Sequence, residues 1–239
     1  MRRAILFIVG CCFSLQFVTH ARAGACVEVA LVLAIDASSS VTDEEFGFQK
    51  RAVAETFRDA GMADVVRRSR AVAVAVVVWG DQRVARQVLN WRVVKSAQEA
   101  IRFADDVERL PRAVHGNTDI GSGLWTALDM FDQGDVCANK LVVNLSGDGR
   151  ESRYPRRRTG PSIRDARVRA SAMGVTINGL VLTKNDPGLD HYYRTQVISG
   201  PHSFVEEVTG STYSELAEAM KRKLLREVEG LPLFAQERR

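Results

Sequence analysis

Residues 36–40 (DASSS) are the stretch of the sequence with the clearest chemical potential. They follow an apolar run, residues 29–35, of the kind that forms a strand buried on both faces of a parallel sheet. A loop that leaves the carboxyl end of such a strand lies where open α/β sheets bind their ligands. One carboxylate and two hydroxyls, at positions 36, 38 and 40, offer hard oxygen ligands of low total charge. Such a set suits Mg²⁺, which proteins hold with one or two carboxylates plus waters and partner groups.

Two further stretches strengthen this interpretation. Residues 116–121 (GNTDIG) carry Thr118 at the opening of a helical pattern, and residues 141–149 (LVVNLSGDG) form another apolar strand that delivers Asp148 into a glycine-flanked loop. Asp and Ser also cap helices and close turns, so the D-x-S-x-S pattern alone is weak evidence for a metal site. The three stretches together are more specific than any one of them.

Together these loops resemble the metal-ion-dependent adhesion site of von Willebrand factor type A (vWA) domains. In that family a D-x-S-x-S loop, a Thr from a second loop and an Asp from a third share one divalent cation. The resemblance extends over residues 29–229 and implies Mg²⁺, or else Mn²⁺, as the cofactor. The implied ligands are Asp36, Ser38, Ser40, Thr118 and Asp148. The phrases at 145–149, 175–180 and 192–193 are similar to a group of exported bacterial vWA-like proteins known only as a domain of unknown function.

Strands and helices alternate along the chain in the order that would bring these loops together. Apolar runs at 29–35, 71–79, 141–147 and 175–182 indicate buried strands, and the mixed polarity of 84–94 suits an antiparallel edge strand. Capping boxes at residues 42–45, 96–99 and 212–215 predict helix starts, and helices are also expected after Thr118 and over 162–173. We therefore expect a doubly wound, mostly parallel α/β sheet, right-handed and covered by helices on both faces. The vWA resemblance sets the number of strands at six.

The first 23 residues have the features of a secretory signal, namely Arg2 and Arg3, an apolar middle and the small-residue motif ARA at 21–23. The apolar part is short and interrupted for a membrane span, although a retained N-terminal anchor is the alternative. We expect an exported protein, periplasmic or secreted. Its single vWA-like domain would cover residues 24–230, and residues 231–239 would form a flexible tail.

Loss of that segment changes the charge balance. It removes three arginines, so 33 basic residues become 30 against 29 acidic ones and the net charge falls from +4 to +1. We therefore expect no nucleic-acid partner and no binding to an anionic membrane surface through overall charge. The short apolar segment predicts no stable membrane insertion. A local basic stretch containing Arg156, Arg157 and Arg158 would neighbour the metal loops and steer an acidic partner to them, with a solvated loop as the alternative.

Of the four cysteines, Cys26 and Cys137 remain after the first 23 residues are removed, and an even pair in an exported protein suggests a disulfide. Each precedes an apolar strand by a few residues, so both should lie at the end of the sheet opposite the metal loops. The vWA strand order would make these two strands parallel neighbours, close enough for a disulfide. Two thiols without a nearby histidine make a poor zinc site.

Three functions remain open at this stage. The first, which we expect, is a metal-dependent protein-binding module in which an acidic residue of a partner completes the coordination of the cation. Only Asp36 and Asp148 carry charge, so the bound ion would still attract an external anion. Another is a scaffold that folds without metal, in which the hydroxyls cap helices.

The main alternative is a Mg²⁺-dependent hydrolase of phosphate esters, with Asp36 or Ser38 as the nucleophile. It requires a positioned base or a phosphate clamp. His115 is the histidine closest in sequence to a candidate ligand, and Asp119 is either an acid behind the ligands or a helix-capping carboxylate. The sequence contains no glycine-rich phosphate loop with its lysine, which disfavours a nucleotide enzyme.

Overall fold

The computed structural model describes residues 25–69, 71–81, 83–84, 86–134, 136–152, 160–210 and 212–229, with side chains from residue 27 onward. The expected signal segment, the C-terminal tail and Arg156, Arg157 and Arg158 lie outside the described residues. Within these ranges no helix is both long and apolar enough to cross a membrane.

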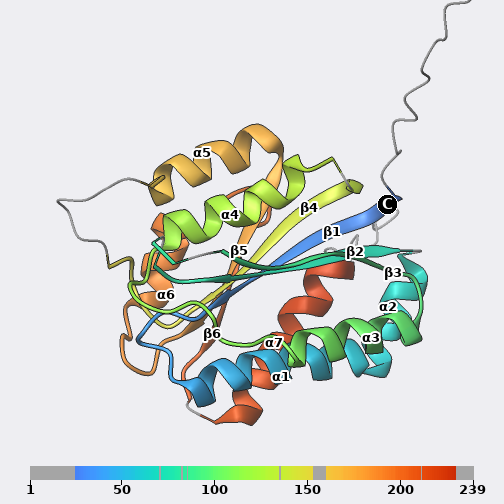
Figure 1. Ribbon diagram of the computed structural model, residues 1–239, viewed down its shortest axis with the longest axis horizontal. Helices are drawn as coiled ribbons and strands as arrows, with labels where there is room; N and C mark the ends of the chain where they lie inside the picture. Colours follow the sequence, from blue (N-terminus) through green and yellow to red (C-terminus); the bar gives the residue numbers. More distant parts are fainter. Residues whose placement is uncertain are drawn as a thin grey trace, which may run out of the picture.

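A six-stranded sheet forms the centre of the molecule (Figure 1). Its strands are β1 (Ala25–Asp36), β2 (Val72–Trp79), β3 (Gln87–Val94), β4 (Val136–Gly147), β5 (Val175–Leu182) and β6 (Val205–Val208). They lie in the order β3-β2-β1-β4-β5-β6, and all neighbours are parallel except β2 and β3. The predicted fold class is confirmed, including the antiparallel edge strand.

Helices cover both faces of this sheet (Figure 1). One face carries α1 (Asp43–Arg58), α2 (Ala60–Arg68), α3 (Ala97–Glu108) and α7 (Tyr213–Glu229). The other carries α4 (Ile120–Asp132), α5 (Ile163–Met173), α6 (Leu189–Tyr192) and the π-helix η2 (Tyr193–Val197). Along β1 the side chains alternate between the two cores, with Leu31 and Leu33 on the first face and Val32 and Ala34 on the second. This two-sided burial explains the unbroken apolar run in the sequence.

The helix starts follow the local signals. Thr42 and Glu45 form a capping box at α1, in which Thr42 Oγ1 accepts from the Glu45 N–H at 3.1 Å and Glu45 accepts from the Thr42 N–H at 2.8 Å. Ser96 caps α3 by accepting from the Glu99 N–H. These caps satisfy N–H groups that a helix leaves without internal partners, and so they fix where each helix begins.

The structure adds elements that the sequence pattern did not separate. Helix α2 begins immediately after α1, and Asp59 ends the first helix and caps the second. Strand β6 has only four residues, which is too few for a periodic pattern. The edge strand begins at Gln87 rather than at residue 84. The 4-residue helix α6 and the π-helix were also not expected.

A buried ionic network attaches α7 to the middle of the sheet. Lys223 and Glu227, one turn apart, are 0% and 1% exposed, and Lys223 Nζ donates to Glu227 Oε1 at 2.5 Å. Glu227 also accepts from the side-chain amides of Asn144 at 2.7 Å and Asn178 at 2.9 Å. Buried charges require such partners, so this network defines how α7 sits against β4 and β5.

The two cysteines occupy paired positions on neighbouring strands. In the register of β1 and β4, Cys26 is paired with Cys137, as the predicted adjacency requires. Both lie inside their strands rather than before them, at the end opposite Asp36. Cys137 is disulfide-bonded. Because the Cys26 side chain is outside the described part of the chain, its pairing with Cys137 stays a proposal, which the register favours.

We expect reduction of this bridge to lower the melting temperature without removing metal binding. A disulfide closing a loop of about 110 residues contributes up to about 4–5 kcal/mol in the chain-entropy model. Non-reducing mass spectrometry and thermal melts with and without reductant test this. Two free thiols in the exported protein would contradict the pairing.

Candidate metal site

Three loops meet at the carboxyl ends of β1 and β4 and the N-terminus of α4. The first loop (residues 37–42) leaves β1, the second loop (residues 115–119) leads into α4, and the third loop (residues 148–152) leaves β4. Parallel neighbours β1 and β4 end at the same edge of the sheet, which places the first and third loops side by side.

Polar atoms at the end of β1 and in the first and third loops form a series of close contacts. The Asp36 carboxylate is fully buried, and its Oδ1 accepts from the Ser38 N–H at 2.8 Å. The hydroxyls of Ser38 and Ser40 are 3.1 Å apart, and Ser40 Oγ donates to Asp148 Oδ1 at 2.7 Å. The structure thus brings these four predicted site residues together.

Thr118 completes the set from the second loop. It is 7% exposed, and its hydroxyl oxygen faces the third loop, 4.0 Å from the position of a Cβ built on Gly149. Its role as a ligand stays a prediction.

The chemistry of these residues fits a small, hard dication. Oxygens about 3 Å apart are what adjacent ligands of an octahedral Mg²⁺ require at metal–oxygen distances of about 2.0–2.1 Å. Asp36 Oδ2 is buried and has no hydrogen-bond partner among the described residues, so it has lone pairs for a cation. In the described part of the chain no group of three His, Cys, Asp or Glu residues is arranged to hold a metal ion. A cation here would depend on hydroxyls and external oxygen ligands.

Each pair of loops is also joined directly. The Ser39 N–H donates to the Gly116 carbonyl at 2.8 Å and Ser39 Oγ accepts from the Gly116 N–H at 3.0 Å, which joins the first loop to the second. Thr118 and Ser152 join the second and third loops in the same reciprocal way, at 3.0 and 2.9 Å. With the contact between Ser40 and Asp148, the three loops form a closed set of links.

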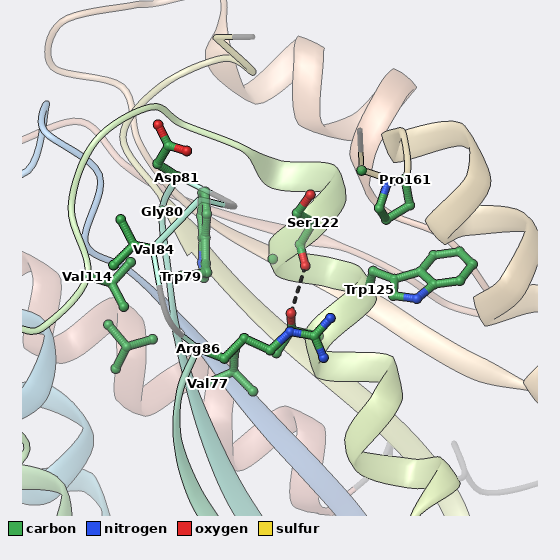
Figure 2. A pocket seen from close by; sticks show the side chains of 14 residues that line it. Val77, Trp79, Gly80, Asp81, Val84, Arg86, Val114, Ser122, Trp125 and Pro161 are labelled. Carbon is green, nitrogen blue, oxygen red and sulfur yellow. Dashed lines mark hydrogen bonds between the residues drawn. The ribbon is translucent and has the colours of Figure 1, made fainter. Parts of the chain in front are cut away.

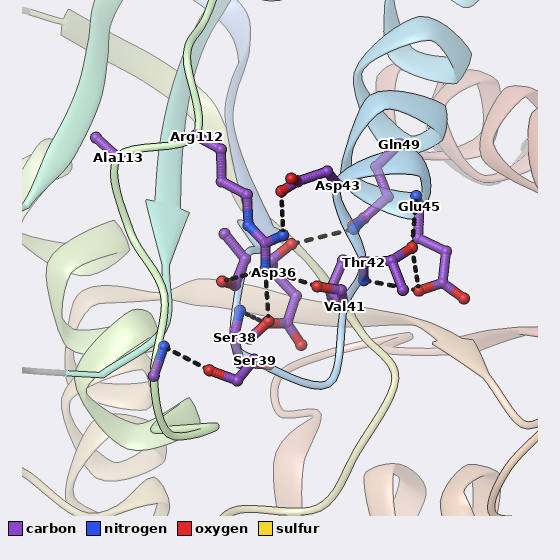
Figure 3. Close-up of polar contacts among 12 residues, drawn as sticks. Asp36, Ser38, Ser39, Val41, Thr42, Asp43, Glu45, Gln49, Arg112 and Ala113 are labelled. Carbon is purple, nitrogen blue, oxygen red and sulfur yellow. Dashed lines mark hydrogen bonds and ion pairs between the residues drawn. The ribbon is translucent and has the colours of Figure 1, made fainter.

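Arg112 holds the first loop from outside (Figure 3). Its Nη2 donates to the carbonyls of Ala37, Ser38 and Val41 at 3.2, 2.9 and 2.6 Å, and its Nη1 pairs with Asp43 at 2.6 Å. The Asp43 side chain is 92% exposed, so this ion pair adds little stability. The carbonyl contacts determine the curvature of the loop, because a guanidinium presents several donors in a rigid plane.

A second support comes from within the core. Gln49 on α1 donates to the Asp36 carbonyl at 3.1 Å and accepts from Ser146 Oγ at 2.6 Å, while Ser146 lies 3.4 Å from the Asp36 N–H. Gln49 and Ser146 are both 2% exposed. This network ties the ends of β1 and β4 to α1 and fixes the backbone that carries Asp36.

Burial and like charge make the site electrostatically unfavourable for two free carboxylates. Burial, followed by the charge of Asp148, raises the pKa of Asp36 to about 7. The pKa of Asp148 is also raised, first by burial, although its hydrogen bond from Ser40 opposes the shift. A dication would offset both effects.

The remaining sequence candidates have different places. Asp119 caps α4 by accepting from the Ser122 N–H at 3.2 Å, which confirms the helix-capping interpretation. His115 is exposed, and its backbone carbonyl accepts from the Asp81 N–H at 3.1 Å. Neither observation supplies the positioned base that the hydrolase hypothesis needs.

Three residues that hold the end of β1 and the first loop were not predicted from the sequence. Gln49 had a usable signal, since it is a polar residue on the apolar face of α1 near Phe46 and Val53. Arg112 had none, because backbone carbonyls, which any residue provides, are its main partners. Ser146 had the same kind of signal as Gln49, because it is a polar residue inside an apolar strand.

A cavity of about 280 Å³ adjoins the second loop, between the end of β2 and the start of α4 (Figure 2). Trp79, Asp81, Ser122 and Trp125 are among its lining residues. Arg83 donates to Asp81 at 2.9 and 2.5 Å and holds the pKa of that carboxyl at about 2. Gly116 has a φ of +92°, and a Cβ on it would lie 2.6 Å from Asp81 Cβ. The close packing of the second loop against Asp81 therefore requires glycine at this position.

A family model described as "Protein of unknown function (DUF1194)" matches residues 25–232. No curated protein matches the chain.

Solved structures with the same fold have low sequence identity. The mussel byssus protein PTMP1, in a structure with a zinc-occupied MIDAS motif, is 20% identical with a TM-score of 0.51, and the match covers 86% of this chain and 46% of PTMP1. The vWF domain of the pilus tip protein Mfa5 from Porphyromonas gingivalis is 12% identical with a TM-score of 0.57, covering 86% and 96%. The SpRpn10 VWA domain is 15% identical with a TM-score of 0.55, covering 84% and 97%. The chain thus spans about half the length of PTMP1, and these matches show a vWA fold.

We expect Mg²⁺ to stabilise the protein more at pH 8 than at pH 5. The folded pKa of Asp36, about 7, exceeds its ordinary value of 3.8. This residue therefore lowers the stability of the metal-free fold as pH rises through that window, and protons compete with the cation below about pH 7. As the pH falls below about 7, the apparent affinity for Mg²⁺ should fall by up to about tenfold per pH unit. Melting curves with and without Mg²⁺, compared with Asp36→Asn, measure this, and a pH-independent Mg²⁺ effect would contradict it.

Proposed function

This chain belongs to the DUF1194 family of proteins of unknown function and has a vWA-type fold, and we propose that it is an exported, metal-dependent protein-binding module. The cation is Mg²⁺, with Mn²⁺ as the alternative, held by Asp36, Ser38, Ser40, Thr118 and Asp148. An acidic residue of a partner protein completes its coordination.

The contact chain from Ser38 through Ser40 to Asp148, beside the buried Asp36, is the observation that supports this proposal most directly. These oxygens come from two separate loops and are 3.1 and 2.7 Å apart. Hydroxyls that only capped helices would not need to meet a carboxylate of another loop. When bound, the cation would supply an electrophilic centre that attracts an anion, while the protein residues hold its other ligands in place.

The exposure of the ligands indicates where a partner approaches. Asp36 and Ser38 are buried, whereas Ser40 is exposed and Asp148 is partly exposed. The cation would therefore be reached from the Ser40 and Asp148 side. With only two carboxylates in the set, the site loaded with a dication is neutral rather than negative overall, so an external carboxylate remains a favourable ligand.

The similar structures are consistent with a role in adhesion. PTMP1 is a thread matrix protein of the mussel byssus, and Mfa5 is a pilus tip protein. For PTMP1 the occupied motif contains zinc. We propose by analogy an extracellular or periplasmic protein partner, and Mg²⁺ rather than zinc, because oxygen-only ligand sets favour hard cations.

The variant Asp36→Asn should lose most Mg²⁺ binding, about 100-fold or more, while remaining folded. The change removes the buried ligand charge but keeps the side-chain volume, and so it opens no cavity. Ser38→Ala and Thr118→Ala should weaken binding less, because they remove neutral ligands. Calorimetric titration with Mg²⁺ and Mn²⁺ measures each affinity.

Asp43→Asn is the matched control, since Asp43 lies beside the same loop but is exposed and pairs with Arg112. It should bind Mg²⁺ as the wild type does. Equal binding by wild type and Asp36→Asn would refute the ligand assignment. If the assignment holds, crosslinking to exported proteins with and without chelator would identify partners whose capture requires both the cation and Asp36.

The basic stretch gives a further prediction. Replacing Arg156, Arg157 and Arg158 with Ser should slow association with an acidic partner and reduce its salt dependence, because charges at a rim act mainly on the association rate. Mg²⁺ affinity should hardly change. Association kinetics measured at several salt concentrations decide this, and unchanged rates would reject a steering role.

A further inference from the structure

Tyr193 lies in the core directly behind the metal loops. It is 0% exposed and stands at the junction where α6 passes into the π-helix η2. The Ile198 N–H donates to the Tyr193 carbonyl at 3.0 Å, which closes the wide turn. Short π-helices are rare and occur frequently at functional sites.

Two glycines make room for the Tyr193 ring. A Cβ built on Gly179 of β5 would lie 3.0 Å from Tyr193 Cδ1. A Cβ on Gly147, at the end of β4, would overlap the Tyr193 hydroxyl and lie 3.4 Å from Asp36 Oδ2. The tyrosine hydroxyl and the Asp36 carboxylate oxygen therefore face the same small space beside Gly147.

Both of these atoms lack hydrogen-bond partners among the described residues. A buried hydroxyl without a partner lowers stability, and phenylalanine would fill the same space without that cost. Packing alone therefore does not account for a tyrosine rather than a phenylalanine at position 193. A carboxylate oxygen has lone pairs enough to accept a hydrogen bond and bind a cation at once, and metal-ligating carboxylates are commonly held by such hydrogen bonds.

We propose that Tyr193 is a positioning residue of the metal site, whose buried hydroxyl orients Asp36 Oδ2 when a divalent cation is bound. This inference rests on the proposed function and deepens it. It connects the α6 and η2 segment with the metal through Asp36.

The neighbouring residue contacts the third loop from the other side. Tyr192 Oη accepts from the Glu151 N–H at 3.4 Å, and the Arg150 guanidinium lies 5.4 Å from the centre of the Tyr192 ring. Arg150 also pairs with Asp186, just before α6, at 2.6 Å. The segment 186–197 thus contacts the third loop at its exposed side, and on the buried side it places the Tyr193 hydroxyl beside Gly147, near Asp36 Oδ2. Loading of the site and the position of this segment are coupled.

Tyr193→Phe tests the assignment. We expect the variant to bind Mg²⁺ at least about tenfold more weakly, the usual cost of removing a group that orients a metal ligand. Its metal-free form should melt no lower than the wild type, because an unpartnered hydroxyl is removed. Added Mg²⁺ should perturb the ultraviolet absorbance of tyrosine in the wild type and not in the variant. A merely structural tyrosine would instead lower the melting temperature and leave the affinity unchanged.

Tyr213→Phe is the matched control, since it also removes a buried tyrosine hydroxyl, but one at the start of α7 beside Phe48 rather than behind Asp36. It should bind Mg²⁺ as the wild type does. If the wild type binds Mg²⁺ and Tyr193→Phe binds it equally well, this inference fails while the proposed function stands. If the wild type binds neither Mg²⁺ nor Mn²⁺, the proposed function fails, and this inference with it.

A double-mutant cycle without metal tests the geometry independently. Gly147→Ala should destabilise the wild type, because its methyl group would overlap the Tyr193 hydroxyl. In the Tyr193→Phe background the nearest ring atom would be Cζ at 3.3 Å, so the loss in melting temperature should be smaller. An equal loss in both backgrounds would overturn the placement of the hydroxyl beside Gly147.

Discussion

The burial of the Asp36 carboxylate is the constraint on which the arrangement of the site depends. A charge taken out of water is costly unless hydrogen bonds, opposite charges or a metal compensate for it. Here one oxygen accepts from the Ser38 N–H, the other has no partner in the described part of the chain, and Asp148 adds repulsion. This balance raises the pKa of Asp36 and favours a bound cation.

The scaffold maintains this costly arrangement because each loop is anchored to a rigid element. Arg112 binds three carbonyls of the first loop, and Gln49 and Ser146 hold the end of β1 against α1 and β4. Far from the site, the buried pair Lys223 and Glu227 fixes α7 against the sheet. Sites built on packed strands and helices hold their geometry better than sites on free loops.

The exposed and buried sides of the site have different roles. Ser40 and Asp148 face outward, where a partner would approach, whereas Tyr193 and Gly147 lie behind Asp36 in the core. A change at either side would be felt at the other through one carboxylate. This provides a physical route between partner binding and the α6 and η2 segment, because a carboxylate can serve both a cation and a hydrogen-bond donor.

The sequence by itself determined the fold class and the residues most suited to bind a metal. Apolar runs, capping boxes and the D-x-S-x-S loop are local signals, and β1, α1 and the oxygen-bearing loops could be predicted from them. The neighbouring register of Cys26 and Cys137 followed from the family resemblance. Only the tertiary structure placed Arg112, Gln49 and Tyr193 around Asp36 and the first loop. Their partners are backbone carbonyls, a buried serine and a space beside a glycine, which are distant in sequence and leave no periodic pattern.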